Sequence, residues 1–136
     1  MDMALRISLR DGEKMILNGA VLRSVGRTDL CIENNAVLLR GRDLMTPEEA
    51  NTPARRLYFA CMMAYVDQNE LDAHQDDIIR LVRDLIEALQ SPEAKSVCIS
   101  FAQHVATGQY YKALADCRWL INYETEALQR CENQAA

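Results

Sequence analysis

The sequence has few of the residues that catalytic and metal sites need. Histidine occurs only at His74 and His104, and the motifs HExxH, GxSxG, GxGxxG and the Walker loop are all missing. Cys98 and His104 lie six residues apart, which puts them on different faces of a helix, and no further ligands follow at a zinc-site spacing. We therefore expect no enzymatic activity, no metal ion and no other cofactor.

The sequence also lacks an excess of positive charge and a long apolar run. The net charge of −5 at pH 7 excludes binding of nucleic acid through bulk charge, so any such site must be a local patch. The longest apolar run, residues 57–66, has ten residues, which is too short to cross a bilayer core of ~30 Å. We expect no membrane partner.

The cysteines follow no disulfide or metal pattern. There are five of them, an odd number with no CxxC pair, which is typical of reduced thiols. The N-terminal segment MDMALRISLRDGEK has neither the apolar core nor the cleavage site of a signal peptide. We therefore expect a cytoplasmic protein.

What is present is the composition of an ordinary globular domain, with 136 residues, 49% apolar and 26% charged. Residues 1–45 carry the pattern of short strands, because apolar and polar residues alternate over 4–9 and turn signals recur. Asn18-Gly19 is the strongest hairpin signal among them. We expect five strands, closed as a meander or small barrel, at 4–9, 15–17, 20–25, 30–33 and 36–40.

Residues 46–136 carry the pattern of helices. Thr46 to Glu49 form a capping box with proline at the first helical position, and Thr52-Pro53 repeat the start signal. We expect a short helical turn and then helices over about 53–66, 70–90, 92–107 and 109–131. The fold class is therefore α+β, with an N-terminal small antiparallel β-sheet or partial barrel followed by a C-terminal helical bundle of three to five helices.

Charge divides unevenly between the two halves. Residues 1–56 hold nine Lys/Arg and eight Asp/Glu, whereas residues 57–136 hold six and twelve. The β subdomain, residues 1–45, is therefore the plausible host for a polyanion such as RNA, although few aromatics are there for base stacking. The alternative is a solvated face in which these cations alternate with acidic residues. The candidate RNA-binding residues are Arg6, Arg10, Lys14, Arg23, Arg27, Arg40 and Arg42.

Two helices of the second subdomain, residues 46–136, carry candidate interaction surfaces. The helix at 57–66 is apolar all round, so it is either central to the bundle or partly covered by a partner. The last helix has a 4,3-spaced seam from Tyr110 to Cys131, which predicts packing along another helix, within the chain or from a second copy. Glu124 interrupts this seam, either as a solvated position or as a residue that sets register. The candidate protein-interaction residues are Leu57, Phe59, Met62, Met63, Tyr110, Leu114, Ile121 and Leu128.

Three segments, 5–22, 37–67 and 110–124, resemble the FlbT family of flagellum-biosynthesis regulators. TPARRLYF and YYKAL, in this order and at this separation, are the specific parts of the resemblance, which covers nearly the whole chain. The resemblance implies a post-transcriptional role. Family members are associated with the 5′ untranslated leader of flagellin mRNA and promote its decay or restrict its translation, although some activate, and the family often works beside the FlaF protein.

Two hypotheses follow. In the first, the β subdomain binds the flagellin mRNA leader, the helical subdomain makes protein contacts, and a recruited cellular ribonuclease carries out any decay. In the second, the chain is a protein-binding adaptor or chaperone-like partner of flagellin or FlaF and affects mRNA indirectly. Self-association into a homo-oligomer is compatible with either hypothesis.

Overall fold

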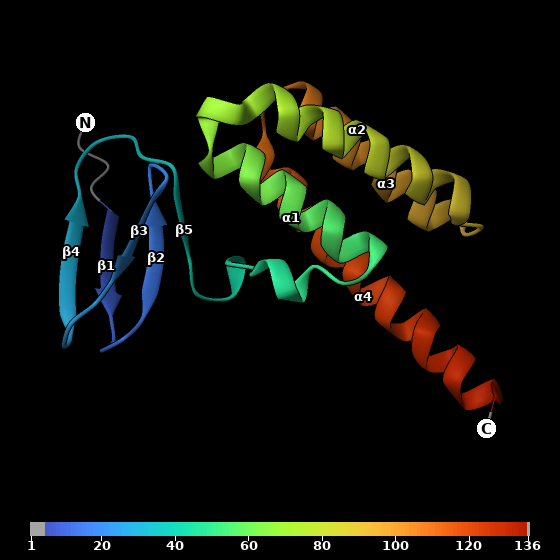
Figure 1. Cartoon of the computed structure of the whole chain (residues 1–136), viewed down its shortest axis with the longest axis horizontal. Coiled ribbons are helices and arrows are strands. Elements are labelled where there is room, and N and C mark those ends of the chain that lie inside the picture. Colours follow the sequence, from blue (N-terminus) through green and yellow to red (C-terminus); the bar gives the residue numbers. More distant parts are fainter. Residues whose placement is uncertain (1–4, 136) are drawn as a thin grey trace.

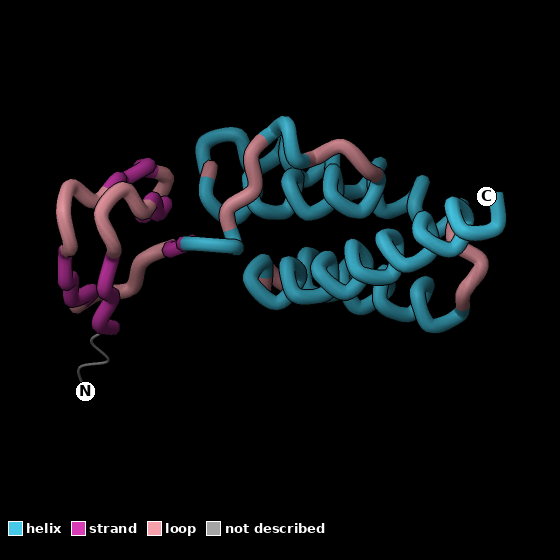
Figure 2. The backbone as a smooth tube through the Cα atoms, turned by 90° about the horizontal axis from the view of Figure 1, so that it is seen from below, coloured by secondary structure: helices cyan, strands magenta, loops and turns pink. Residues whose placement is uncertain are grey.

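The computed structural model describes residues 5–135 and has two parts joined by the segment 41–52 (Figures 1 and 2). Five strands gather at one end of the molecule, and four α-helices form a bundle at the other. The elements in chain order are β1 (Leu5–Leu9), β2 (Lys14–Leu17), β3 (Ala20–Arg23), β4 (Thr28–Ile32), β5 (Leu38–Arg40), α1 (Pro53–Val66), α2 (Leu71–Ala88), α3 (Pro92–Ala106) and α4 (Tyr110–Ala135). The α+β fold class predicted from the sequence is confirmed.

The strands do not follow each other as a meander. β1 pairs antiparallel with β4 in a two-stranded sheet, while β2 lies between β3 and β5 in a three-stranded antiparallel sheet. The expected meander order is therefore wrong. The strands form two sheets because they enclose a small core of their own. Ile7 and Leu9 of β1 pack with Met15 of β2, so β1 and β2 face each other across this core instead of pairing edge to edge.

The Asn18-Gly19 hairpin connects β2 to β3 as the sequence predicts. Both residues have positive φ, 50° and 84°, which is the geometry of the tight turn that suits antiparallel strands. A Cβ on Gly19 would lie 3.1 Å from the carbonyl oxygen of Val66, at the end of α1. The Asn18 side chain accepts a hydrogen bond from the backbone N–H of Val37 at 2.9 Å. The hairpin tip is therefore docked between the segment before β5 and the helical bundle.

α1 packs against α2 and α4 in the bundle. It begins and ends where the sequence predicts, with the Thr52 side chain accepting from the backbone N–H of Arg55 and Pro53 in the first turn. Eight of its fourteen residues are buried, and they pack with apolar side chains of α2, α3 and α4 such as Ile78, Phe101 and Leu114. Phe59, Met63 and Tyr65, on the rest of its surface, are half-buried, so α1 is not covered on all sides within the chain.

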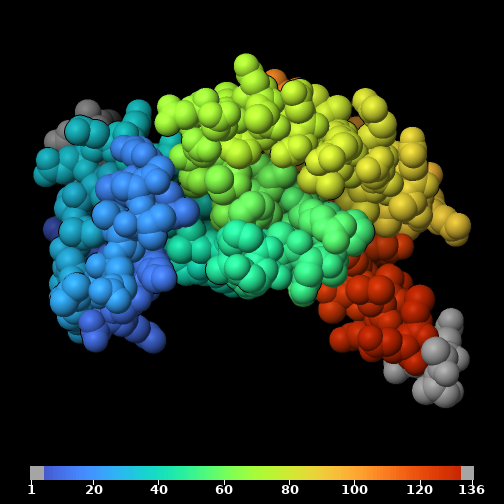
Figure 3. Space-filling view, viewed as in Figure 1, coloured from blue at the N-terminus to red at the C-terminus, as the bar shows by residue number. Residues whose placement is uncertain are grey.

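α4 departs from its predicted seam along its length. Leu114 and Cys117 are fully buried, but the next buried residue is Leu120 rather than Ile121, and Leu128 is 51% exposed. A straight helix drifts by ~20° per heptad relative to a 3.5-residue repeat, so the 4,3 seam turns away from the bundle. The C-terminal turns of α4 also extend past the other helices (Figures 1 and 3).

None of the helices in the described part of the chain has the length and apolar character needed to span a membrane.

Candidate nucleic-acid interface

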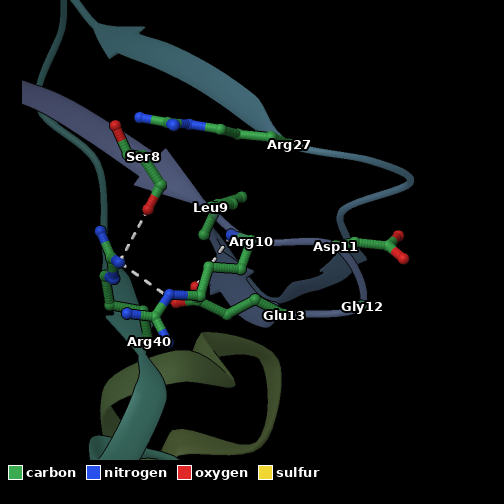
Figure 4. Close-up of a pocket in the computed structure, with 8 residues that line it drawn as sticks. All are labelled: Ser8, Leu9, Arg10, Asp11, Gly12, Glu13, Arg27 and Arg40. Carbon is green, nitrogen blue, oxygen red and sulfur yellow. Dashed lines mark hydrogen bonds and ion pairs between the residues drawn. The ribbon is translucent and has the colours of Figure 1, made fainter.

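A hollow of about 1100 Å³ opens at one end of the β subdomain (Figure 4). Three of the seven candidate RNA-binding residues line it, and they come from three separate places in the chain: Arg10 after β1, Arg27 before β4 and Arg40 at the end of β5. The remaining lining residues are Ser8, Leu9, Asp11, Gly12 and Glu13. The fold thus gathers guanidinium groups that lie 30 residues apart in sequence.

The alternation along β1 places Arg10 at the hollow. Ile7 and Leu9 are buried in the small core, so Ser8 and Arg10 lie on the other, exposed side of the strand. Arg27 is held near this strand end by the turn before it, because the backbone N–H of Gly26 donates to the Asp11 carboxylate at 2.8 Å. In Figure 4, Arg27 extends along one side of the hollow while Arg10 and Arg40 lie on the other.

Glu13 fixes Arg40 in place. The Arg40 Nη2 donates to Glu13 Oε2 at 3.1 Å and to the carbonyl oxygen of Ser8 at 3.0 Å. The other carboxylate oxygen of Glu13 accepts from the backbone N–H of Arg10 at 3.1 Å. That backbone hydrogen bond first, and then the charge of Arg40, hold the pKa of Glu13 below its ordinary value. The carboxylate is therefore ionised at neutral pH and keeps the Arg40 fork oriented.

The charges at the hollow are suited to binding an anion. Within residues 5–135, no carboxylate lies in ion-pair contact with the guanidinium of Arg10 or of Arg27. The hollow is lined by three guanidinium groups and two carboxylates. The Asp11 carboxylate already accepts a hydrogen bond from the Gly26 N–H, and the Glu13 carboxylate already accepts one from Arg40. Arginine forks bind phosphate oxygens through paired hydrogen bonds, so the two free forks can hold a phosphate group in the hollow.

Four of the seven candidates lie elsewhere. Arg6 is on β1 opposite Cys31, and Lys14 lies directly opposite Arg23 in the β2–β3 ladder. Arg42 lines a different pocket, beside the bundle. The seven cations therefore do not form one continuous patch. The sequence pattern identified the cations of the hollow but not Glu13, the residue that orients Arg40 in the structure.

The predicted protein-interaction residues divide by burial. Leu57, Met62, Tyr110 and Leu114 are at most 7% exposed and belong to the core of the bundle, so their assignment to a partner surface is corrected. They fill the core because α1 and α4, which carry them, pack against each other in the bundle. Of the other candidates, Phe59, Met63 and Ile121 are half-buried, and Leu128 is exposed.

Phe59 and Met63 line a groove of about 400 Å³ along α1 and α2, together with Arg56 and Leu81. Since these two side chains are only half-buried, this groove is accessible to a partner, as is the exposed Leu128 near the end of α4.

Two contacts fix the connection between the β subdomain and the bundle. The Tyr58 hydroxyl donates to the carbonyl oxygen of Asp43 at 2.8 Å, and the Asp43 carboxylate forms an ion pair with Arg118 of α4. The Arg118 guanidinium also lies over the Tyr58 ring, 5.9 Å from its centre. None of these residues was a candidate in the sequence, because the contact joins positions 75 residues apart.

Glu124 links two helices. Its Oε2 accepts from the backbone N–H of Ala54 at 3.0 Å, at the start of α1. The first turn of a helix has unpaired N–H groups and a partial positive charge, so a carboxylate from α4 satisfies both. Of the two interpretations of Glu124, the helix–helix contact is confirmed.

The histidines make hydrogen-bond contacts with nearby aspartates. His104 Nδ1 lies 2.6 Å from the Asp116 carboxylate, which also accepts from the Ser100 hydroxyl at 3.3 Å, and His74 Nε2 lies 3.1 Å from Asp67. The serine donates to the aspartate and not to the imidazole, so the cluster lacks the order of a Ser-His-Asp relay and serves to join α3 to α4. In the part of the chain that the structure describes, no three His, Cys, Asp or Glu side chains are grouped to hold a metal ion.

The comparisons with known proteins agree on one family. The family model for the flagellar protein FlbT matches residues 5–128. A probable flagellum biosynthesis repressor protein FlbT from Caulobacter sp. strain K31 is 38% identical over 127 residues, covering 93% of this chain and 97% of the relative.

Two further relatives carry the same name. The protein from Rhodopseudomonas palustris strain TIE-1 is 36% identical over 94% of this chain and 100% of its own length. The protein from Agrobacterium fabrum is 31% identical over 97% of this chain and 89% of its own length. No solved structure matches. The match extends from β1 into the last turns of α4, and the chain belongs to the FlbT family of flagellar proteins.

Proposed function

We propose that this protein represses flagellum biosynthesis after transcription, by binding the 5′ untranslated leader of flagellin mRNA in the hollow of the β subdomain. The observation that carries the proposal is the convergence of Arg10, Arg27 and Arg40 on one hollow, in a chain whose relatives are named flagellum biosynthesis repressors. Because the chain as a whole has a net charge of −5, a polyanion such as RNA has to bind at a local cluster of positive charge of this kind.

Contact with the RNA runs through phosphate and sugar groups. Residues 5–45 contain no aromatic residue, so the β subdomain offers no platform on which unpaired bases could stack. Arginine forks that bind phosphates position the RNA and make the affinity fall with salt, by ~0.7 log units per log unit of salt for each phosphate on a single strand. The engaged carboxylates of Asp11 and Glu13 leave no free acid–base pair at the hollow, so decay of the message falls to a recruited ribonuclease.

The test is direct binding of a labelled flagellin leader to the purified protein near physiological salt. Arg27→Glu reverses an exposed cation of the hollow that forms no ion pair within residues 5–135, and Lys112→Glu makes the same charge change on the exposed surface of α4. We expect binding by the wild type, a loss of about tenfold or more for Arg27→Glu, and little change for Lys112→Glu. Absence of binding by the wild type, or equal losses for both variants, overturns direct recognition at the hollow.

A second function, that of an adaptor which binds flagellin or FlaF and acts on mRNA indirectly, is favoured by the half-buried Phe59 and Met63 in the α1–α2 groove. Affinity purification from flagellated cells with and without ribonuclease distinguishes the two. Flagellin or FlaF retained after ribonuclease treatment supports the adaptor, and loss of both with the RNA supports the leader-binding repressor.

A further inference from the structure

β3 is an exposed edge strand. Within residues 5–135 it pairs only with β2, and all four of its residues are exposed. Val21 is 68% exposed, Leu22 38%, and Val25, just beyond the strand, 84%. Proteins commonly protect such edges with charged residues, proline or a covering element, whereas β3 has three apolar residues and one charge at its end. In the space-filling view this segment lies uncovered on the face shown (Figure 3).

The backbone of β3 has hydrogen-bonding groups that face outward. In an antiparallel hairpin closed by two residues, the flanking pair, here Leu17 and Ala20, is hydrogen-bonded, and bonded pairs then alternate along the ladder. The N–H and C=O groups of Val21 and Arg23 therefore point away from β2. An extended segment placed alongside β3 can pair with both residues and continue the sheet.

The charges beside this edge are unbalanced. Lys14 of β2 lies directly opposite Arg23 of β3, and both side chains are exposed. No carboxylate of the described residues forms an ion pair with either. Like charges directly opposite each other on neighbouring strands are destabilising, and a carboxylate placed between them would relieve the repulsion.

We propose that the β3 edge binds an extended, acidic segment of a partner protein, which adds to the three-stranded sheet as a fourth strand. Its backbone pairs with Val21 and Arg23, its apolar side chains cover Leu22 on one face of the sheet, and its carboxylates lie against Lys14 and Arg23 on the other face. The surface is separate from the RNA hollow, so the inference does not rest on RNA binding.

The charge pattern argues for an acidic partner segment over a second copy of β3. Residues 20–25 contain no carboxylate, so a copy would bring a second arginine to an edge that is already positive. Four-residue strands also bury far less than the ~1,200 Å² typical of a stable interface, so self-pairing alone would not hold a dimer together. An RNA backbone would meet the lysine and arginine but would gain nothing from the exposed valines.

The test is an NMR titration of the isotope-labelled full chain with two acetylated octapeptides, one alternating valine and glutamate and the other alternating valine and lysine. We expect the glutamate peptide to shift the amide signals of Val21 and Arg23 and to bind about tenfold or more tightly than the lysine peptide. Equal binding of the two peptides, or shifts confined to other elements, overturns the proposal.

Variants separate edge pairing from other contacts. Val21→Pro removes the outward N–H while sparing the ladder with β2, and Val21→Asp makes the edge repel the acidic peptide. Both should weaken binding of the glutamate peptide, whereas Ile99→Asp, at an apolar residue of α3 that is 54% exposed, should not. Lys14→Glu with Arg23→Glu should reverse the preference between the peptides.

Three outcomes for these variants would contradict the proposal. One is equal weakening by Ile99→Asp. Another is a wild-type dimer that Val21→Pro converts to a monomer, which would identify the occupant as a second copy. The third is displacement of the glutamate peptide by leader RNA in the Arg27→Glu background, which would assign the edge to RNA.

Discussion

Glu13 has the clearest role of any acidic residue in the β subdomain, because it contacts both Arg10 and Arg40. Its pKa lies below the ordinary glutamate value, chiefly through the Arg10 backbone N–H. A carboxylate whose pKa is lower in the folded chain than in the unfolded chain stabilises the fold at pH values above the unfolded-state pKa. This stabilisation is lost as the pH falls through the folded-state pKa. We expect the stability difference between wild type and Glu13→Gln to be largest near pH 7 and to shrink in acid, well below pH ~4.3.

Urea unfolding at several pH values measures this difference. Glu33→Gln, at an exposed acidic residue of the same subdomain, is the control and should show little difference at any pH. A Glu13→Gln effect that stays constant from pH 7 into acid would show that the contact does not depend on the ionised carboxylate.

The cysteines divide by burial into two classes. Cys61, Cys98 and Cys117 are buried, and burial raises the pKa of Cys61 to about 12, that of Cys98 to about 11 and that of Cys117 well above its ordinary value. Cys31 and Cys131 are exposed. Since the thiolate is the reactive form, iodoacetamide at pH 8 should modify only Cys31 and Cys131 in the folded chain, and all five after unfolding. Mass spectrometry of the labelled peptides checks this, and fast modification of Cys117 in the folded state would contradict the packing.

Glu124 is the residue-scale contact that joins α4 to α1. Replacing it with alanine leaves the Ala54 N–H at the start of α1 without its acceptor, so we expect Glu124→Ala to lower the free energy of unfolding by about 1 kcal/mol. Glu126→Ala, at an exposed position of the same helix, should change it by less than ~0.5 kcal/mol. Equal effects in urea denaturation would show that the carboxylate contact contributes nothing specific.

At the scale of elements, local signals predicted the structure well. Thr52-Pro53 marked the start of α1, and Asn18-Gly19 marked the hairpin, because caps and tight turns depend on residues adjacent in sequence. The pairing of β1 with β4 could not be predicted in this way. It is decided by which sheet faces can bury Ile7, Leu9 and Met15 together, and this depends on contacts between distant segments.

The burial of residues along α4 also could not be predicted from the sequence pattern alone. Leu114 and Leu128 share one 4,3 seam in the sequence, yet the first is fully buried and the second is 51% exposed, because Leu128 lies at the margin of the bundle, in an open pocket with Leu85 and Leu89. Leu114→Asp buries an uncompensated carboxylate, which costs several kcal/mol, comparable with a total stability of ~5–15 kcal/mol. We expect loss of folding for Leu114→Asp and a change of less than ~0.5 kcal/mol for Leu128→Asp. Thermal melting followed by circular dichroism compares them, and similar melting of both variants would contradict the exposure of the C-terminal turns.

At the scale of the whole molecule, the uneven charge of the two halves was predictable from composition, but the hollow was not. Arg10, Arg27 and Arg40 meet only because the chain passes from β1 to β2 in the other sheet and returns to β4. The same topology leaves Arg6, Lys14, Arg23 and Arg42 outside the hollow, although charge alone could not separate them from the three that line it. The Asp43–Arg118 ion pair and the Tyr58 hydrogen bond then hold this β subdomain on the bundle.

The salt dependence of leader-RNA binding tests the central claim most directly, because it counts the phosphates that the protein contacts. Arg6 and Arg10 lie on the same side of β1 and are both exposed, but only Arg10 lines the hollow. We expect Arg10→Glu to lower the affinity and to reduce the slope of log affinity against log salt by ~0.7 or more, while Arg6→Glu leaves the slope unchanged. Equal reduction of the slope by both variants would show a diffuse charged face, and an unchanged slope in Arg10→Glu would remove the hollow from the RNA site.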